Sequence, residues 1–372
     1  MNQHNLPRWA TGLVLPLLNL MSALLVAGMV IFALGESPTE SLAIMVKSAF
    51  LNPEGLGYTL FYASTFIFTG LAVAFALHAG LFNIGAEGQM YIGGLGMTLV
   101  LLGLDRTLPG WLVIPLAVVG SAAFGAAWAY LPGYLQAKRG SHIVVTTIMF
   151  NFIASSLMNY IIVSLLIPAG QQTTNSRQFE KSAWLPRLNE WLPALGQTPV
   201  NISLIMALVV LALYAVLIWR TPWGYGIRTV GLNPHAAHYA GISIQRTIIG
   251  VMAVSGALAG MAAVNSEMGS SHHLGLNFTA GAGFIGIAVA LMGRNHPVGI
   301  LLSAILFGGL IQGGFDLSLE KPGIPPETFV FIQGLIILFC GAMENLYAPA
   351  LAAVLKKFRK FSRPGQDGKA AA

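Results

Sequence analysis

Three polar side chains interrupt a long apolar part of this sequence within one short stretch, residues 79–89. Asn83, Glu87 and Gln89 stand there among three glycines. Backbone that leaves a helix at membrane depth is tolerated only where it packs in protein or lines a water-filled cavity. A charge at the bilayer centre costs about 2.5–3.5 kcal/mol on insertion scales, so Glu87 must face a partner or a cavity. Contact with a substrate, a structural bond to the glycine-rich backbone and a place at the cytoplasmic gate remain open for it.

A second polar stretch, residues 265–286, carries Glu267, His272, His273 and Asn277. These groups offer donors and acceptors together, and we interpret them as cavity residues near the outer mouth; an ordinary outer loop is the alternative. An acid beside two histidines could also serve a membrane enzyme on a lipid-linked substrate, or carry protons or ions in a secondary transporter. Two interrupted spans, one in each half of a chain, point to a transport site.

Further candidates lie inside the apolar runs themselves. Asn151, Asn159 and Gln312 either line a route or hydrogen-bond neighbouring helices. Phe284 could stack on a planar ligand, although core or lipid packing explains a single phenylalanine equally well. The sequence holds no G-x-x-x-x-G-K-[ST], H-E-x-x-H, C-x-x-C or G-x-S-x-G motif. We therefore expect no catalytic site and no metal or cofactor bound by this chain, and if ATP drives it, the ATPase is another chain.

The composition sets the class of protein that must hold these residues. Hydrophobic residues make up 55% of the 372, charged residues 9%, and the mean hydropathy is +0.72. A globular domain carries about 25% charged residues, so this chain is expected to be an all-α polytopic membrane protein. The net charge of +6 sits in loops between apolar runs, which the positive-inside rule explains without a nucleic-acid partner.

A membrane span needs about 20 apolar residues, and the sequence offers about ten candidates. Their ranges are 11–34, 58–78, 87–104, 111–135, 142–167, 200–219, 247–264, 277–293, 297–314 and 326–347. An N-terminus on the inside places most of the 19 lysines and arginines in the cytoplasm, and ten spans return the C-terminus there. Residues 1–355 are expected to form one transmembrane domain with an outer cap at 168–199, followed by a basic, disordered tail, 356–372.

One short stretch between two spans reads as a separate helix on the cytoplasmic side. Asn233 suits an N-cap, Pro234 the first helical position, and Gly241 a left-handed C-terminal position. Small residues and a tyrosine between these ends would fit a groove on a partner, and a connector resting on lipid headgroups is the alternative. The predicted docking residues are Asn233, Pro234, Ala236, Ala237, Tyr239, Ala240 and Gly241.

Four motifs in order give the chain a resemblance to a known family. Residues 82–90 read Phe-Asn-Ile-Gly-Ala-Glu-Gly-Gln-Met, and residues 146–154 read Thr-Thr-Ile-Met-Phe-Asn-Phe-Ile-Ala. Residues 231–242 carry the capped helix, and residues 283–299 contain Gly-Ile-Ala-Val-Ala-Leu-Met-Gly-Arg-Asn-His-Pro. The chain resembles the inner-membrane permeases of binding-protein-dependent ABC importers, in the branched-chain amino acid and ribose-type branch, with the nucleoside and simple-sugar permeases nearest.

This resemblance implies a bacterial inner-membrane permease that imports a nucleoside or related sugar-containing solute. It implies a pairing with a second permease, identical or homologous, with cytoplasmic ATPase subunits that bind ATP and Mg²⁺, and with an extracytoplasmic solute-binding protein. The short helix at 233–240 would dock into the ATPase. One departure stands at residues 141–142, where Ser-His replaces an acidic residue that relatives often carry.

Overall fold

The computed structural model describes residues 14–325, 327–342, 349 and 351 of the chain. Within these residues the regular structure is helical, and isolated β-bridges join Asn175 to Gly275 and Arg187 to Asn201. The expected all-α class is confirmed. The chain divides into two compact units, residues 1–39 with 323–372 and residues 40–322. The predicted tail at 356–372 and the domain boundary at 355 fall outside the described residues and stay predictions.

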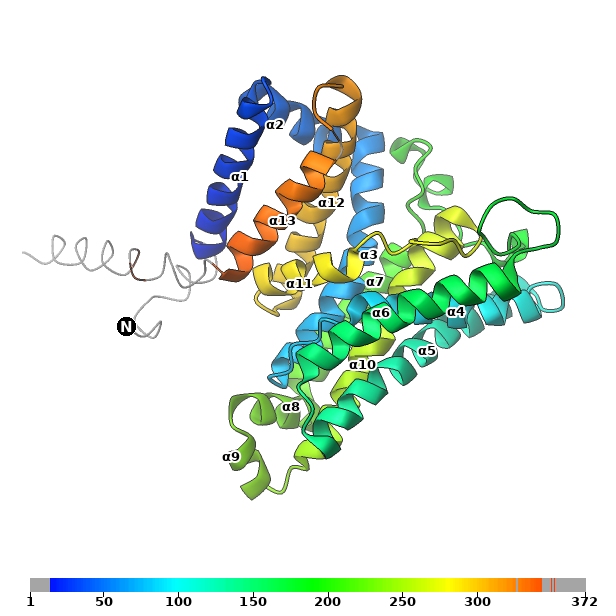
Figure 1. Ribbon diagram of the computed structural model, residues 1–372, viewed down its shortest axis with the longest axis vertical. Coiled ribbons are helices and arrows are strands. Elements are labelled where there is room, and N and C mark those ends of the chain that lie inside the picture. The colour runs from blue at the N-terminus through cyan, green and yellow to red at the C-terminus, as the bar shows by residue number, and fades with distance from the viewer. Residues whose placement is uncertain (1–13, 326, 343–348, 350, 352–372) are drawn as a thin grey trace, which may run out of the picture. The chain divides into compact units, whose positions relative to one another are not determined.

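In the first unit, helix α1 (Leu15–Ala33) packs along helix α13 (Glu327–Ala342), as Figure 1 shows. Ala23, Ala27 and Ile31 of α1 recur every four residues and are buried, whereas the flanking apolar side chains are exposed. A helix that is apolar on every side belongs in a membrane or a protein core. The exposed sides of α1 are therefore suited to lipid.

The second unit holds the remaining helices and the polar stretches found in the sequence. They are α2 (Pro38–Val46), α3 (Pro53–His78), α4 (Ala86–Leu104), α5 (Gly110–Arg139), α6 (Ile143–Ile161), α7 (Ser203–Arg220), α8 (Pro222–Leu232), α9 (Pro234–Tyr239), α10 (Ile244–Ala263), α11 (Ala282–Met292) and α12 (Pro297–Glu320). Wider π-helical turns follow α2, α6 and α10: η3 (Lys47–Leu51), η4 (Ile162–Leu166) and η8 (Val264–Ser271).

Each of the ten predicted spans contains a helix, but not every helix is long enough to cross a membrane alone. Six described helices have the length and apolar character of a span, and a seventh is gained if the bent pair Leu20–Ala33 and Pro38–Leu51 counts as one. Helix α11 is short, which fits an interrupted segment. The membrane character of the chain is confirmed, while the number of ten and the cytoplasmic termini stay predictions.

Helices α4, α5, α6 and α10 run side by side (Figure 1), and α5 and α10 touch backbone to backbone. A Cβ atom on Gly256 would lie 2.3 Å from the carbonyl oxygen of Gly125. Ser121 donates a hydrogen bond to the carbonyl of Gly260 at 2.7 Å one turn further along. Small residues allow this close packing, which dispersion and hydrogen bonds stabilise where lipid supplies no hydrophobic drive.

The predicted outer cap is an ordered segment fixed to the ends of two helices. Three short 3₁₀ turns follow one another in it: Lys181–Ala183, Leu188–Glu190 and Pro193–Leu195. Arg177 binds both carboxylate oxygens of Asp105, at 2.6 and 2.9 Å, just past the end of α4. The N–H of Phe179 donates to the carbonyl of His272 at 2.8 Å, beyond the end of η8. The cap therefore ties α4 to α10.

Asp105→Asn is expected to loosen this cap. Burial opposes the charge of Asp105, but hydrogen bonds from Arg177 and from the N–H of Glu180 outweigh it and hold the pKa of Asp105 below its usual range. An asparagine offers Arg177 one oxygen instead of two, and each hydrogen bond to a charged group is worth about 1.5–3 kcal/mol. Amide hydrogen exchange at Phe179 and Glu180 should accelerate, whereas exposed Glu190→Gln should leave it unchanged.

The same pair predicts how the cap responds to acid. A depressed pKa in the folded state contributes stability that is present above the ordinary aspartate value and is lost as pH falls through the lowered value. Exchange in the native protein should therefore approach that of Asp105→Asn as the solution is acidified. Equal exchange of the two proteins at neutral pH would show that the ion pair does not hold the cap.

Candidate functional site

Asn83 and Gln89, two predicted path residues, form a closed pair in the buried interior. The Asn83 amide oxygen accepts from the N–H of Gly85 at 2.9 Å and from Gln89 Nε2 at 3.1 Å. Its amide nitrogen donates to Gln89 Oε1 at 3.0 Å and to the hydroxyl of Ser255 at 2.8 Å. The side chain of Asn83 thus uses its full bonding capacity inside the protein, fixing the non-helical stretch against α10.

Asn151 continues this structural bonding from α6. Its amide nitrogen donates to the carbonyl of Ile84 at 2.9 Å, and its amide oxygen accepts from the N–H of Gly88 at 2.9 Å. A residue that leaves the helix, such as Ile84, has an unpaired carbonyl that must find a partner. Asn151 supplies that partner and joins α6 to the first turn of α4.

Glu87 joins the two interrupted stretches that the sequence singled out. One of its carboxylate oxygens accepts from the Thr279 hydroxyl and from the N–H of Gly281 at 3.1 Å. The other accepts from the N–H of Gly283 at 2.7 Å. Both oxygens act only as acceptors, which is the bonding pattern of an ionised carboxylate. Of the three roles left open for Glu87, the structure shows the bond to glycine-rich backbone.

Helix α11 begins at this carboxylate, so Glu87 neutralises the positive end of the helix. The contact leaves no room for a larger residue, because a Cβ atom on Gly283 would lie 2.3 Å from the backbone nitrogen of Glu87. The first turn of α4 and the first turn of α11 therefore meet backbone to backbone. This is an internal version of the anion site that helix N-termini form in many proteins.

The acid and histidine of the second stretch bind backbone groups rather than each other. Glu267 is buried and accepts from the N–H of Gly275 at 3.1 Å. Nδ1 of His272 lies 3.0 Å from the carbonyl of Met268, and its ring stacks on Trp184 with centroids 3.8 Å apart. An enzyme would need the two side chains to act together, and no hydrogen bond joins them in the described structure.

Burial lowers the pKa of His272 more than its contact with the Met268 carbonyl raises it. The charge of Arg187 lowers this pKa further. A pKa below the ordinary histidine value favours the neutral imidazole at pH 7. His273 is half-buried beside it.

A polar cavity of about 330 Å³ opens between α4, α6 and the segment before α11. Its lining residues are Tyr91, Ser155, Ser156, Met158, Asn159, Leu276 and Asn277. The Tyr91 hydroxyl donates to the amide oxygen of Asn277 at 3.3 Å, closing one side. Sites for small molecules occupy about 300–1,000 Å³, so the cavity has the volume for a small solute.

The sequence found this cavity only in part. Asn277 was predicted and lines it, and Asn159 had been considered, whereas Tyr91, Ser155 and Ser156 were missed. The available signal was the spacing of three and four residues from the two serines to Asn159, which places them on one face of an otherwise apolar helix. Several predicted path residues lie outside the lining, and their contact with a solute stays a prediction: Asn83, Glu87, Gln89, Asn151, Glu267, His272, His273 and Phe284.

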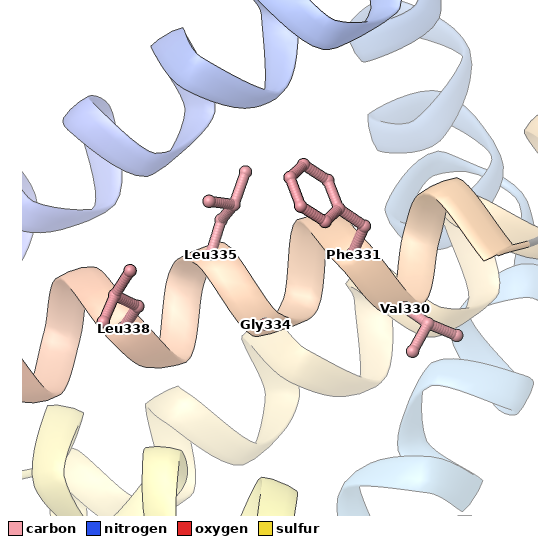
Figure 2. Close-up of a pocket in the computed structure, with 5 residues that line it drawn as sticks. All are labelled: Val330, Phe331, Gly334, Leu335 and Leu338. Atoms are coloured by element: carbon pink, nitrogen blue, oxygen red, sulfur yellow. The ribbon is translucent and has the colours of Figure 1, made fainter.

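A larger hollow lies on α13, in the first unit, but its chemistry is different. It measures about 570 Å³ and is lined by Val330, Phe331, Gly334, Leu335 and Leu338. Figure 2 shows Phe331 and Leu335 rising from the same side of the helix. None of these five side chains can form a hydrogen bond, so the described part of this surface suits lipid rather than a polar solute.

The predicted cytoplasmic helix is present as α9, and its ends follow the expected rules. The Asn233 side chain accepts from the N–H of Ala236 at 3.1 Å, Pro234 opens the helix, and Gly241 has a φ of +77°. Tyr239 is 91% exposed, whereas Ala237 is fully buried. The sequence could not show that Ala237 faces inward, and the predicted contacts of α9 with a partner stay predictions.

Comparison with known proteins decides the family. The family model for the permease component of branched-chain amino acid transport systems matches residues 55–341. The chain belongs to this family. The nucleoside permease protein NupB of Lactococcus lactis is 35% identical, over 88% of this permease and 90% of that protein.

Two further relatives cover nearly the whole permease. The guanosine ABC transporter permease protein NupP of Bacillus subtilis is 33% identical over 94% of this chain and 97% of that protein. The glucose ABC transporter permease protein TsgB13 of Haloferax volcanii is 31% identical over 95% of this chain and 92% of that protein. The permease is therefore a multi-pass membrane protein related to transport subunits, as the four motifs predicted.

Proposed function

We propose that this permease is the transmembrane subunit of an ABC importer and moves a nucleoside or a related sugar-containing solute across the bacterial inner membrane. The observation that supports this most strongly is the similarity to nucleoside permeases over nearly the whole chain. The cavity between α4 and α6 fits the proposal, since its hydroxyl and amide groups suit the hydroxyls of a ribose. A solute with only apolar ring surfaces would not need these hydroxyl and amide groups.

The second permease subunit in our proposal is a different chain. Two permeases from Bacillus subtilis, NupP and NupQ, and two from Lactococcus lactis, NupB and NupC, are similar to this chain. NupQ is 31% identical over 67% of this chain and NupC 29% over 74%, so both are more distant than their counterparts. This chain would take the place of NupP or NupB beside a shorter homologue.

In the proposed importer, partner ATPase subunits bind at helix α9 and supply the energy of transport by hydrolysing ATP. ATP binding would bring two such helices together and shift the spans between outward-open and inward-open states. A binding protein outside would deliver the solute. Direction follows only if ATP and solute bias the same two-state element, because a ligand shifts an equilibrium by its differential affinity alone.

The test of this proposal is co-purification of the partner ATPase subunit from detergent. It compares the intact chain with Tyr239→Ala. Tyr239 is chosen because it is exposed, whereas a bulky change at buried Ala237 would disturb the fold. We expect the variant to lose most of the ATPase, since aromatic anchors carry much of the binding energy at interfaces. Leu192→Ala, an exposed apolar residue of the outer cap, should bind the ATPase normally.

Two outcomes would contradict the proposal. The intact chain could fail to bring down any ATPase, or uptake into vesicles could continue without ATP and stop with an uncoupler. The second result would favour a proton- or ion-coupled secondary transporter. Equal binding by Tyr239→Ala and the intact chain would instead remove α9 as the docking element.

A further inference from the structure

The polar cavity is lined by groups that carry no formal charge. Tyr91 and the two serines offer hydroxyls, and Asn159 and Asn277 offer amides. Each of these groups can both donate and accept hydrogen bonds. Among the described lining residues there is no lysine or arginine, so the lining offers a solute anion no cation with which to pair.

A buried carboxylate of the protein lies on one of the helices that line the cavity. Glu87 lies four residues before Tyr91 on α4, so both side chains stand on one face of that helix. They bind the same segment: Tyr91 reaches Asn277, and Glu87 reaches Thr279. The N–H groups of Gly281 and Gly283 donate to Glu87 and favour its charged form, and no ion pair to it exists among the residues that the structure describes.

Glu87 also fills the place where a transporter could hold an anionic solute. In transporters with interrupted helices, the N-terminus of a half-helix near mid-membrane points at an anionic group of the substrate. Here the half-helix is α11, and its N–H groups at Gly281 and Gly283 already bind Glu87. The positive end of α11 is therefore used within the protein and is closed to a solute.

From this arrangement we infer that the cavity of Tyr91, Ser156, Asn159 and Asn277 admits neutral or cationic solutes and rejects anions, with the Glu87 carboxylate as the residue that sets this selectivity. The inference rests on the proposed function in one respect, because it names the form of the transported solute. A nucleoside passes, whereas its phosphate ester is excluded at the permease itself, independently of any choice made by the binding protein.

The chain offers a direct measurement because it contains a single cysteine, Cys340. In the assembled importer in liposomes, Cys340→Ser is combined with Ser156→Cys in the cavity or with Gln172→Cys on the exposed cap. Each protein is treated with a trimethylammonium-ethyl or a sulfonato-ethyl methanethiosulfonate. The thiolate attacks the reagent's sulfenyl sulfur, a disulfide forms, and methanesulfinate leaves. Both reagents react in this way, and the groups that they transfer carry opposite charges.

We expect the ratio of cationic to anionic modification rates to be on the order of tenfold higher at residue 156 than at residue 172. The Glu87 carboxylate attracts the cationic reagent and repels the anionic one, so both effects raise the ratio. Guanosine should slow the modification at 156, and guanosine monophosphate should not. Glu87→Gln should lower the ratio toward that of the cap, and the exposed Glu190→Gln should leave it unchanged.

Equal ratios at the two positions, or no modification at residue 156 by either reagent, would overturn the inference. If Glu87→Gln does not assemble, the ratio measured with Glu87 present still decides. The two proposals fail separately: ATP-driven nucleoside uptake with equal ratios would refute the selectivity alone. A high ratio in a protein that shows no ATP-driven uptake would refute the proposed function alone.

Discussion

Gly231→Ala is expected to uncouple ATP hydrolysis from uptake while the ATPase subunits stay bound. A Cβ atom at this position would lie 2.2 Å from the carbonyl oxygen of His78 and 2.9 Å from the nitrogen of Gly80. Such distances are far inside van der Waals contact, so α8 must move away from the backbone at the end of α3. That backbone begins the non-helical stretch that leads to Glu87.

The contact matters because it joins helix α9, the proposed docking helix, to the cavity by a short physical path. Gly231 lies two residues before Asn233, the N-cap of α9. On its other side, the stretch after His78 is fixed by Asn83 to α10 and leads into α4, which carries Tyr91. Movement of α9 can therefore reach the cavity wall through backbone contacts, and packed backbone has few ways to yield.

Uptake by Gly231→Ala should fall by about 5–150-fold, the range of a typical coupling free energy, with ATPase activity retained. Alanine favours the helix by about 1 kcal/mol over glycine, so a loss cannot come from weaker helix formation. Gly226→Ala on the same helix is the matched control, because its Cβ would meet its nearest atom at 3.7 Å. Equal uptake by the two variants would show that this contact does not transmit the movement.

Helix α9 was predictable from sequence because its ends follow local rules, whereas its docking role stays a prediction. An asparagine, a proline and a terminal glycine fix where α9 begins and ends through their own backbone preferences. Its inner face was not predictable, since fewer than two turns give too short a pattern to separate buried Ala237 from exposed Tyr239. That distinction depends on packing against α8 and α10, which no local rule contains.

For the polar residues of the interrupted stretches, the sequence identified the residues but could not identify their bonding partners. The sequence placed Asn83, Glu87 and Gln89 in an interrupted stretch and predicted them as residues of the solute path, leaving a structural bond open for Glu87. It could not say which partners, because Ser255 and Thr279 lie more than 170 residues away along the chain. Tyr91 looked like one more apolar residue of its helix, and only its bond to Asn277 places it at the cavity.

Glu87→Ala is expected to cause the largest loss of stability of any single change in the cavity region. It removes the acceptor of three donors, the Thr279 hydroxyl and the N–H groups of Gly281 and Gly283. Each buried donor left without a partner costs about 1–3 kcal/mol, and water cannot readily replace the carboxylate at this depth. Replacing a buried charge can be harmless when its partners change with it, but backbone N–H groups cannot be removed.

The melting temperature in detergent should fall clearly for Glu87→Ala and less for Glu87→Gln, which keeps one acceptor oxygen. Thr279→Val should lose part of the same set, so the double variant Glu87→Ala, Thr279→Val should be less destabilised than the sum of the two single changes. Exposed Glu190→Ala should melt like the native protein. Strict additivity would mean that Glu87 and Thr279 act independently, and the carboxylate would then not be what holds the cavity wall to α4.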